Sequence, residues 1–422
     1  MTEPASDRLD SWKAIAEYLR RDVATVRRWE RERGLPAHRV PGGRGTSVFA
    51  YRSEIDAWLR AKNDTTVTVP PRRHAWAIGT VAAAMTLAVV WRLHSAPITI
   101  PVEDLKIAVG ESAVVATDPR GAEMWRYRTP AGYRLSFSEY GDRSVAVSGV
   151  TPAVYAISGT RVRLSDSRVE SGELMEFSAD GVLRRTFAFD DHVTFDRQRY
   201  GPPWGITALA VDESHGSRRI AVAAHHFEWS ASVVTVLDEN FRRLGTYWQW
   251  GWIEGVRWLG PDRLLIAGFN DARDGGMVAL LDPSTMNGQS PEAAGAHGYC
   301  DDCGRTSPVK MVVMPRSELN RATQSRFNRV QLEVLPDRIV ARTIEVPQGT
   351  SDAVDALYEF SPQLDLVRAS FSGPYLELHD ALSARGQLDH DRQHCPDRSG
   401  PRQILTWDRD RGWQPLHISH PT

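Results

Sequence analysis

Arginine side chains gather in one short stretch near the N-terminus of this 422-residue chain. Residues 22–40 read DVATVRRWERERGLPAHRV, and helical spacing places one set of side chains on the outward side. This set is Thr25, Arg27, Arg28 and Arg31. Guanidinium groups bind phosphates and the major-groove edge of guanine, so the stretch predicts DNA binding. The alternative is a solvated helix face, because Glu30 and Glu32 partly neutralise the arginines.

Cysteine and histidine residues in the second half could also carry chemistry. The stretch GYCDDCG places Cys300 and Cys303 in a C-x-x-C pattern, which suits half a zinc site, a redox pair or a disulfide loop. A zinc site would be completed by Cys395 with His390 or His394. We expect a disulfide among the three cysteines instead, because this part is predicted to lie on the oxidising side of a membrane. The sequence leaves open which cysteine remains unpaired.

Two short helices are predicted to position the arginines. The first covers SWKAIAEYL, where apolar residues recur at i, i+3, i+4 and i+7 and Ser11 or Asp10 stands at the N-cap position. Its core-facing residues are Trp12, Ile15, Ala16 and Leu19. The second helix is predicted over about residues 23–33, with Val26 and Trp29 facing inward. Two helices joined by a tight turn fit the helix-turn-helix plan, in which the second helix enters the major groove.

A hairpin and a third helix complete the predicted front domain. Residues 38–52, HRVPGGRGTSVFAYR, are typical of two strands around a glycine-rich tip that carries Arg44. The stretch SEIDAWLRA follows as a helix, with Ser53 at its predicted N-cap. Its core-facing residues are Ile55, Trp58 and Leu59. The sequence therefore predicts a small α+β domain over residues 1–62.

This front domain resembles the winged helix-turn-helix DNA-binding domains of the MerR/excisionase type. The matching residues are Thr25-Val26-Arg27-Arg28-Trp29-Glu30, Gly34-Leu35-Pro36, Arg39, Tyr51-Arg52 and Ile55 with Leu59. The resemblance implies that Arg27 and Arg28 read the major groove. It also implies that the hairpin wing grips the DNA backbone, through Arg39, Arg44, Tyr51 and Arg52. MerR regulators continue into a long dimerising helix. This sequence continues instead into a linker and a predicted membrane helix, so we do not infer MerR-type dimerisation or metal sensing for it.

The charge distribution agrees with a DNA-binding front and a different role for the rest. Residues 1–62 hold 13 Lys and Arg against 9 Asp and Glu, a balance of +4, although the whole chain carries −2. The rest of the chain is therefore acidic and avoids phosphates. The 41% hydrophobic and 25% charged residues are ordinary for globular protein and exclude wholesale disorder.

Residues 75–93 are predicted to form a single transmembrane helix. No residue from Ala75 to Trp91 is charged, and tryptophans at both ends suit the headgroup zones. Residues 63–74 form the linker, and their Arg72 and Arg73 make the more basic flank, which favours a cytoplasmic N-terminus. The charged first 70 residues contain no cleavable signal peptide. We expect a single-pass protein of a bacterial inner membrane, the alternative being an alanine-rich core helix.

Residues 94–422 are predicted to form an extracytoplasmic all-β domain, a β-propeller of six or seven blades interrupted around residues 286–328. An apolar strand, a polar turn and a second strand recur along this part. The turns are centred on Asp118, Ser178, Asp238, Asp282, Ser361 and Asp408. Two stacked β-sandwiches are the alternative. The tryptophans of WQWGWIEGVRW (248–258) favour packing between blades over ligand stacking.

Two stretches resemble known propeller repeats. VVATDPRGAEMWRYRTP is similar to quinoprotein-type repeats, and ALAVDESHGSRRIAVAAHH is similar to FG-GAP repeats. FG-GAP loops often bind calcium, but after Asp212 and Glu213 the later carboxylates are missing here, so we expect no calcium. The quinoprotein resemblance is too short to imply a cofactor, and we expect none. No nucleophile motif, paired carboxylates or phosphate loop predicts an enzyme.

The sequence thus favours a membrane-tethered transcription regulator with an external sensing domain. Its expected partners are DNA, the lipid bilayer and an extracytoplasmic ligand or protein, with signalling by homodimerisation or by release of the front domain. The second hypothesis is a membrane-anchored scaffold whose winged fold docks a protein. The third is an extracytoplasmic enzyme such as a quinone-linked dehydrogenase, which would need convergent acid-base groups or a cofactor.

Overall fold

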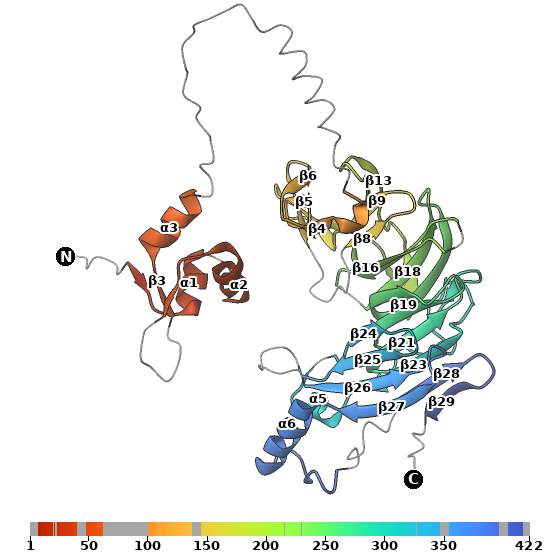
Figure 1. The fold of residues 1–422 in the computed structure, drawn as a ribbon. Helices are drawn as coiled ribbons and strands as arrows, with labels where there is room; N and C mark the ends of the chain where they lie inside the picture. Colours follow the sequence, from red (N-terminus) through yellow and green to blue (C-terminus); the bar gives the residue numbers. More distant parts are fainter. Residues whose placement is uncertain are drawn as a thin grey trace, which may run out of the picture. The chain divides into compact units, whose positions relative to one another are not determined.

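The chain forms two compact units, Met1–Ala96 and Pro97–Thr422, which are described separately (Figure 1). The computed structural model describes residues 7–19, 21, 23–39, 48–61, 100–136, 145–214, 216–228, 230–325, 327–346, 354–395 and 404–416. Within these ranges, no helix is both long enough and apolar enough to cross a membrane. The predicted linker and membrane helix, residues 63–93, lie outside the described residues.

In its described residues, the N-terminal unit combines three helices with a small sheet. Its elements are β1 (Arg8–Leu9), α1 (Trp12–Leu19), α2 (Val23–Arg33), β2 (His38–Arg39), β3 (Val48–Tyr51) and α3 (Arg52–Ala61). Strand β3 lies between β1 and β2 and is antiparallel to both. The buried core is Leu9, Ile15, Ala16, Val26, Leu35, Val48, Ala50 and Ile55. The predicted helices and hairpin strands are confirmed, whereas β1 was not predicted because two residues carry no periodicity.

The helix caps in this unit agree with the sequence at α1 and differ from it at α3. Ser11 Oγ accepts a hydrogen bond from the Ala14 amide at 3.1 Å, as expected of an N-cap. Ser53 instead lies inside α3, and Asp7 provides the cap. The carboxylate of Asp7 accepts from the Ser53 amide at 3.3 Å and from its hydroxyl at 2.7 Å. The pairing of β1 with β3 brings Asp7 to the start of α3 from 46 residues away.

Among the described residues of the C-terminal unit, five antiparallel sheets follow one another along the chain, with two further sets of paired strands beside them. The first has β4 (Lys106–Val109), β5 (Ala113–Thr117) and β6 (Glu123–Arg128), and the second has β8 (Val145–Ser148), β9 (Ala153–Ile157), β12 (Leu174–Ser178) and β13 (Leu183–Phe187). The third has β16 (Trp204–Asp212), β17 (Arg219–His226), β18 (Ala231–Asp238) and the first half of β19 (Arg243–Trp258). The fourth has the second half of β19, β20 (Leu264–Asn270), β21 (Gly275–Leu281) and β23 (Lys310–Pro315). The fifth has β24 (Val330–Val334), β25 (Ile339–Ile344), β26 (Asp355–Phe360) and β27 (Leu366–Phe371).

The remaining strands and helices of this unit lie outside the five sheets or at their edges. They are η1 (Val102–Asp104), β7 (Tyr133–Ser136), β10 (Thr160–Arg163), β11 (Val169–Ser171), β14 (Val193–Phe195), β15 (Gln198–Tyr200), β22 (Asn287–Gln289), α5 (Glu318–Ala322), α6 (Gly373–Ala384), β28 (Ile404–Asp408) and β29 (Gly412–Leu416). Strand β28 pairs with β23 and so extends the fourth sheet beyond its outer edge. The interruption predicted over residues 286–328 contains β23 and α5, so the regular strands resume at Lys310.

Strand β19 belongs to two sheets because it changes partner at one glycine. Its residues up to Trp250 pair with β18, and those from Gly251 pair with β20. Gly251 has φ +145°, and a Cβ atom there would lie 2.0 Å from the Phe269 carbonyl oxygen. Only glycine tolerates this conformation and this close approach. The tryptophan-rich stretch 248–258 is therefore the passage from the third sheet to the fourth.

The five sheets pack face to face in a propeller-like order. A separate buried cluster fills each of the four interfaces between successive sheets. The first strands β4, β8, β16, the second half of β19 and β24 are neighbours in that order, as Figure 1 shows. Sheets arranged by their first strands in this way define a β-propeller-like, mostly-β unit. The blade number of six or seven remains a prediction.

The predicted turn positions mark the outer hairpins of this unit. Asp118, Ser178, Asp238, Ser361 and Asp408 each end or directly follow the first strand of a hairpin. Each of these side chains accepts a hydrogen bond from a following backbone amide. Asp282 does the same after β21, where β22 and the disulfide loop intervene before β23. Short side chains with an oxygen atom favour such turns. The recurring Asp and Ser residues in the sequence therefore mark where the hairpins turn.

Candidate functional site

Helix α2 has one side that packs on the domain core and another that carries charged residues. Val26 is fully buried, and the Trp29 ring lies 6.0 Å from that of Trp58 in α3, so these residues fix α2 on the domain core. Arg27 is exposed on the other side, with its guanidinium 5.6 Å from the Trp12 ring of α1. Thr25 is half-buried. Arg27 is therefore positioned by α1 yet open to solvent, as a phosphate or base contact requires.

The end of the hairpin contributes an exposed ring and a partly packed arginine. Tyr51 is 36% exposed and packs edge-on against Phe49. Arg52 is half-buried, and its guanidinium lies 5.4 Å from the Tyr18 ring. Arg52 thus joins α3 to α1, and its predicted DNA contact competes with this packing. The side chains of Arg28, Arg31 and Arg39, and the whole of Arg44, lie outside the described residues.

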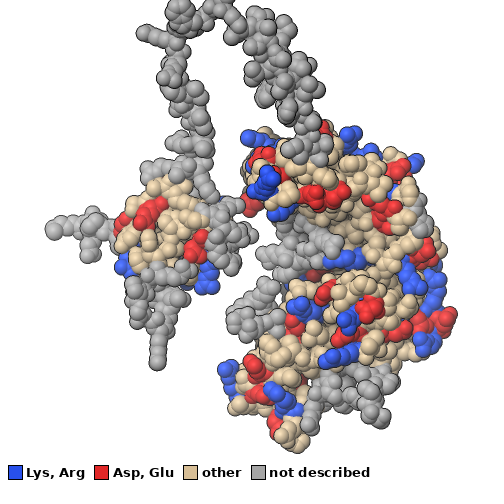
Figure 2. Space-filling view, in the orientation of Figure 1, with Lys and Arg blue, Asp and Glu red and all other residues tan. Residues whose placement is uncertain are grey.

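A contact between a histidine and a glutamate that sequence reasoning missed holds the hairpin to α3. His38 Nε2 lies 2.6 Å from Glu54 Oε2. The ring of His38 also stacks on Phe49 at 5.2 Å. A histidine and a glutamate 16 residues apart carry no recognisable spacing, so only the fold shows the pair. Figure 2 shows acidic and basic side chains of the N-terminal unit on separate parts of the visible face.

The predicted disulfide is confirmed, and its pairing is Cys300 with Cys303. Cys300 is fully buried, and the Gln289 side chain bonds its backbone amide at 2.7 Å and its carbonyl at 2.9 Å. The zinc site considered from the sequence would join these two cysteines to His394 and Cys395, but the described residues do not bring these four side chains together. His394 is an exposed side chain that pairs with Asp391 at 2.6 Å.

The first strands of the sheets line a cavity of about 440 Å³. Its walls are Leu105, Ile107, Val145, Ala146, Val147, Leu209, Ala210, Val211, Arg257 and Trp258. Trp258 is held by a hydrogen bond from its Nε1 to the Ala210 carbonyl at 3.2 Å, and the Arg219 guanidinium lies 4.6 Å from its ring. Most residues that line the cavity are apolar, and Arg257 is the one charged residue among them.

A buried ion pair links the fourth sheet to the fifth. Glu254 on β19 is 5% exposed and accepts a hydrogen bond from Arg329, which precedes β24, at 3.0 Å. Burial raises the pKa of Glu254 to about 7, and Arg329 opposes that rise. His225 stacks on Trp252 at 5.0 Å, and burial lowers the pKa of His225, so its ring is neutral. His225 lies on β17, in the third sheet.

We expect Glu254 to make stability depend on pH. Its folded pKa, about 7, exceeds the ordinary value of 4.5, so the folded protein keeps a proton that the unfolded chain loses. The free energy of unfolding should therefore fall as the pH rises from about 4.5 to 7, and then change no further through this group. Glu254→Gln should flatten that part of a curve of denaturation midpoint against pH. The exposed Glu228→Gln is the control, and equal curves for both variants would contradict the assignment.

Comparisons with known proteins identify no family for this chain. No family model matches it, and no curated protein matches it. Solved structures that resemble it include a protein of unknown function from Bacteroides caccae (10% identity, 63% of this chain and 93% of that one, TM-score 0.27). They also include the Dos1 propeller (12% identity, 64% and 59%, TM-score 0.34) and the β-propeller domain of the Trilobed protease from Pyrococcus furiosus (12% identity, 63% and 80%, TM-score 0.24). These TM-scores are low, so the propeller-like order rests on this chain's own strand pairing.

Proposed function

We propose that this protein is a membrane-tethered, DNA-binding transcription regulator. In this proposal the N-terminal unit is a winged helix-turn-helix domain in the cytoplasm, and residues 75–93 cross the inner membrane. The C-terminal unit is an extracytoplasmic propeller of six or seven blades that senses a ligand or a protein. The observation that carries the proposal is the order α1, α2, β2–β3 hairpin and α3, with Val26 buried and the next residue, Arg27, exposed on α2.

Two further features support DNA as the partner of the N-terminal unit. An arginine presented beside a tight turn between two helices can reach phosphates and guanine edges in the major groove. The hairpin ends at Tyr51, which is exposed and next to α3, where a wing residue can contact the DNA backbone. In this proposal, the cavity among the first strands is the place where a small ligand would bind.

A gel-shift titration of residues 1–66 tests the DNA-binding role. The fragment keeps the whole buried core of the unit, which lies between Leu9 and Ile55. We expect binding to genomic fragments that weakens steeply with salt, because bound phosphates release counterions. Arg27→Ala/Arg28→Ala should weaken binding by on the order of a hundredfold and lower the salt slope by about 2.

The matched control removes two exposed basic residues from the first helix and the turn. Lys13→Ala/Arg21→Ala takes away the same charge, so it should reduce general affinity but keep the preference among DNA sequences. No binding at low salt, even after fusion of the fragment to a dimerising helix, would overturn the DNA-binding role. In that case the protein-docking scaffold becomes the better proposal, and function in cells should then be insensitive to Arg27→Ala/Arg28→Ala.

A further inference from the structure

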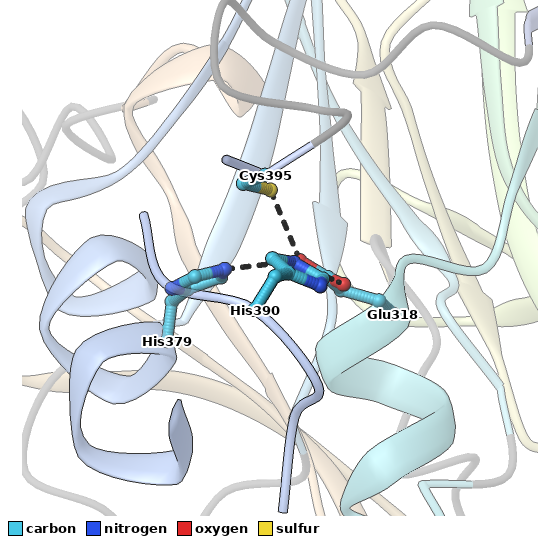
Figure 3. Close-up of side chains that lie close together, drawn as sticks. All are labelled: Glu318, His379, His390 and Cys395. Carbon is cyan, nitrogen blue, oxygen red and sulfur yellow. Dashed lines mark hydrogen bonds and ion pairs between the residues drawn. The ribbon is translucent and has the colours of Figure 1, made fainter. Parts of the chain in front are cut away.

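Four side chains that could bind a metal converge beside the fifth sheet (Figure 3). Glu318 is the first residue of α5, and His379 lies inside α6. His390 and Cys395 come from the segment that follows α6. Figure 3 shows His379, His390 and Cys395 turned towards the Glu318 carboxylate. The fold therefore collects two imidazoles, a thiol and a carboxylate from three separate parts of the chain.

The distances in this cluster suit a tetrahedral ion. Glu318 Oε1 lies 3.2 Å from His379 Nε2 and 3.2 Å from Cys395 Sγ, and Glu318 Oε2 lies 3.2 Å from His390 Nε2. All four ligand atoms lie within 4.8 Å of one another. Zinc bonds of about 2.0–2.3 Å in a tetrahedron separate ligand atoms by roughly 3.3–3.8 Å. The site could therefore close around zinc through small side-chain movements.

The burial of the histidines is a second observation that points to a ligand. The side chain of His379 is 2% exposed, and neither of its nitrogens makes a hydrogen bond of acceptable geometry, despite the short contact with Glu318. The Nε2 of His390 is buried without such a bond as well. Burying polar groups without hydrogen-bond partners destabilises the folded protein. A cation between the two rings and the carboxylate would satisfy the Nε2 atoms of His379 and His390 together.

The surroundings hold the cluster in a metal-binding arrangement. His390 Nδ1 lies 2.7 Å from Asp389, which directs Nε2 inward, as carboxylates do behind zinc-bound histidines. Arg392 bonds Asp380 of α6 at 2.9 Å and the Leu376 carbonyl at 2.9 Å, so it fastens the segment carrying His390 and Cys395 to the helix.

We infer that Glu318, His379, His390 and Cys395 bind one zinc ion. Nitrogen and thiolate ligands favour zinc over magnesium or calcium, which prefer oxygen. Four protein ligands leave no position for water, so the ion is structural rather than catalytic. Cys395 binds as a thiolate and releases its proton. The ion joins α5 to α6 and anchors the segment that leads to β28.

Titration of the full-length protein tests this site. Chelator-treated protein is titrated with Zn²⁺ against a chromophoric zinc indicator, and with Co²⁺ followed by absorption spectroscopy. We expect one equivalent of each metal, and a thiolate-to-cobalt charge-transfer band together with the strong visible bands of tetrahedral cobalt. Cys395→Ser should lose the charge-transfer band and weaken zinc binding by more than roughly tenfold, the lower end of what even an outer ligand partner contributes.

The neighbouring His394 provides the matched control. It is exposed and lies one residue from Cys395, but it is not in the cluster, so His394→Ala should keep both the stoichiometry and the spectrum. Glu318→Gln, with folding checked by circular dichroism, should weaken zinc binding without removing the charge-transfer band. Less than one equivalent of zinc bound by the wild-type protein, or equal zinc affinity in Cys395→Ser and His394→Ala, would overturn the inference.

Discussion

Arg218→Ala should lower the free energy of unfolding by about 3–5 kcal/mol, the cost of removing one partner from a buried ion pair. Arg218 is 9% exposed and lies at the centre of a network between the second and third sheets. Its guanidinium donates to the Tyr155 hydroxyl at 2.6 Å, to the Thr151 carbonyl at 2.7 Å and to Glu213 at 3.1 Å. Without it these acceptors lose their donor inside the protein. Chemical denaturation followed by tryptophan fluorescence measures the change.

Two further variants test whether the charge and the shape of the Arg218 side chain both contribute to this network. Glu176 on β12 has a side chain only 7% exposed and lies between Arg218, at 3.6 Å, and Arg185, at 2.6 Å. Arg218→Lys keeps a charge but loses the planar fork, so it should be destabilising by a smaller amount. The exposed Arg184→Ala is the control and should change stability by less than about 0.5 kcal/mol. Similar denaturation midpoints for Arg218→Ala and Arg184→Ala would contradict the structural role of the network.

Trp204→Ala should cost about 3–5 kcal/mol of stability, because it removes the largest fully buried side chain. Trp204 begins β16, and its ring meets those of His226 and Trp248 edge-on, each at 5.6 Å. Its Nε1 donates to the Asp191 carbonyl at 3.0 Å. Loss of the indole would leave a cavity in the cluster between the second and third sheets. The thermal or chemical denaturation midpoint reports the effect.

Two other substitutions separate the contributions of the ring and the hydrogen bond. Trp204→Phe keeps an aromatic ring but loses the hydrogen-bond donor to Asp191. Its free energy of unfolding should therefore lie between that of the wild type and that of Trp204→Ala. Leu164→Ala is the surface control, since Leu164 is 59% exposed. A loss of stability in Trp204→Ala no greater than that in Leu164→Ala would show that this cluster does not hold the two sheets together.

Local patterns made much of the fold predictable. The helix periodicity around Val26 and Ile15 identified α1 and α2, because one buried stripe on a helix is written directly in the sequence. The turn residues Asp118 and Asp238 identified outer hairpins, because their side chains bond backbone amides two to four residues away. Features of this kind depend on neighbours in sequence and need no knowledge of the tertiary structure.

The cysteines show the same difference between contacts that are local in sequence and contacts that only the fold creates. Cys300 and Cys303 lie three residues apart, so the sequence alone proposed their disulfide as one of a few pairings. The sequence places Cys395 near His390 but does not connect it with Glu318, which lies 77 residues away with no spacing rule between them. Only the packing of α6 against α5 brings the carboxylate to the thiol and the two imidazoles.

The sequence by itself determined the helices and hairpins of the N-terminal unit, the repeated β-hairpins and the disulfide candidates. Each of these is set by interactions within a few residues. Tertiary structure alone decided that Asp7 caps α3, that β19 passes between two sheets at Gly251, and that Glu254 is buried beside Arg329. These contacts join distant segments, and their energies come from burial and close approach, which sequence spacing does not record.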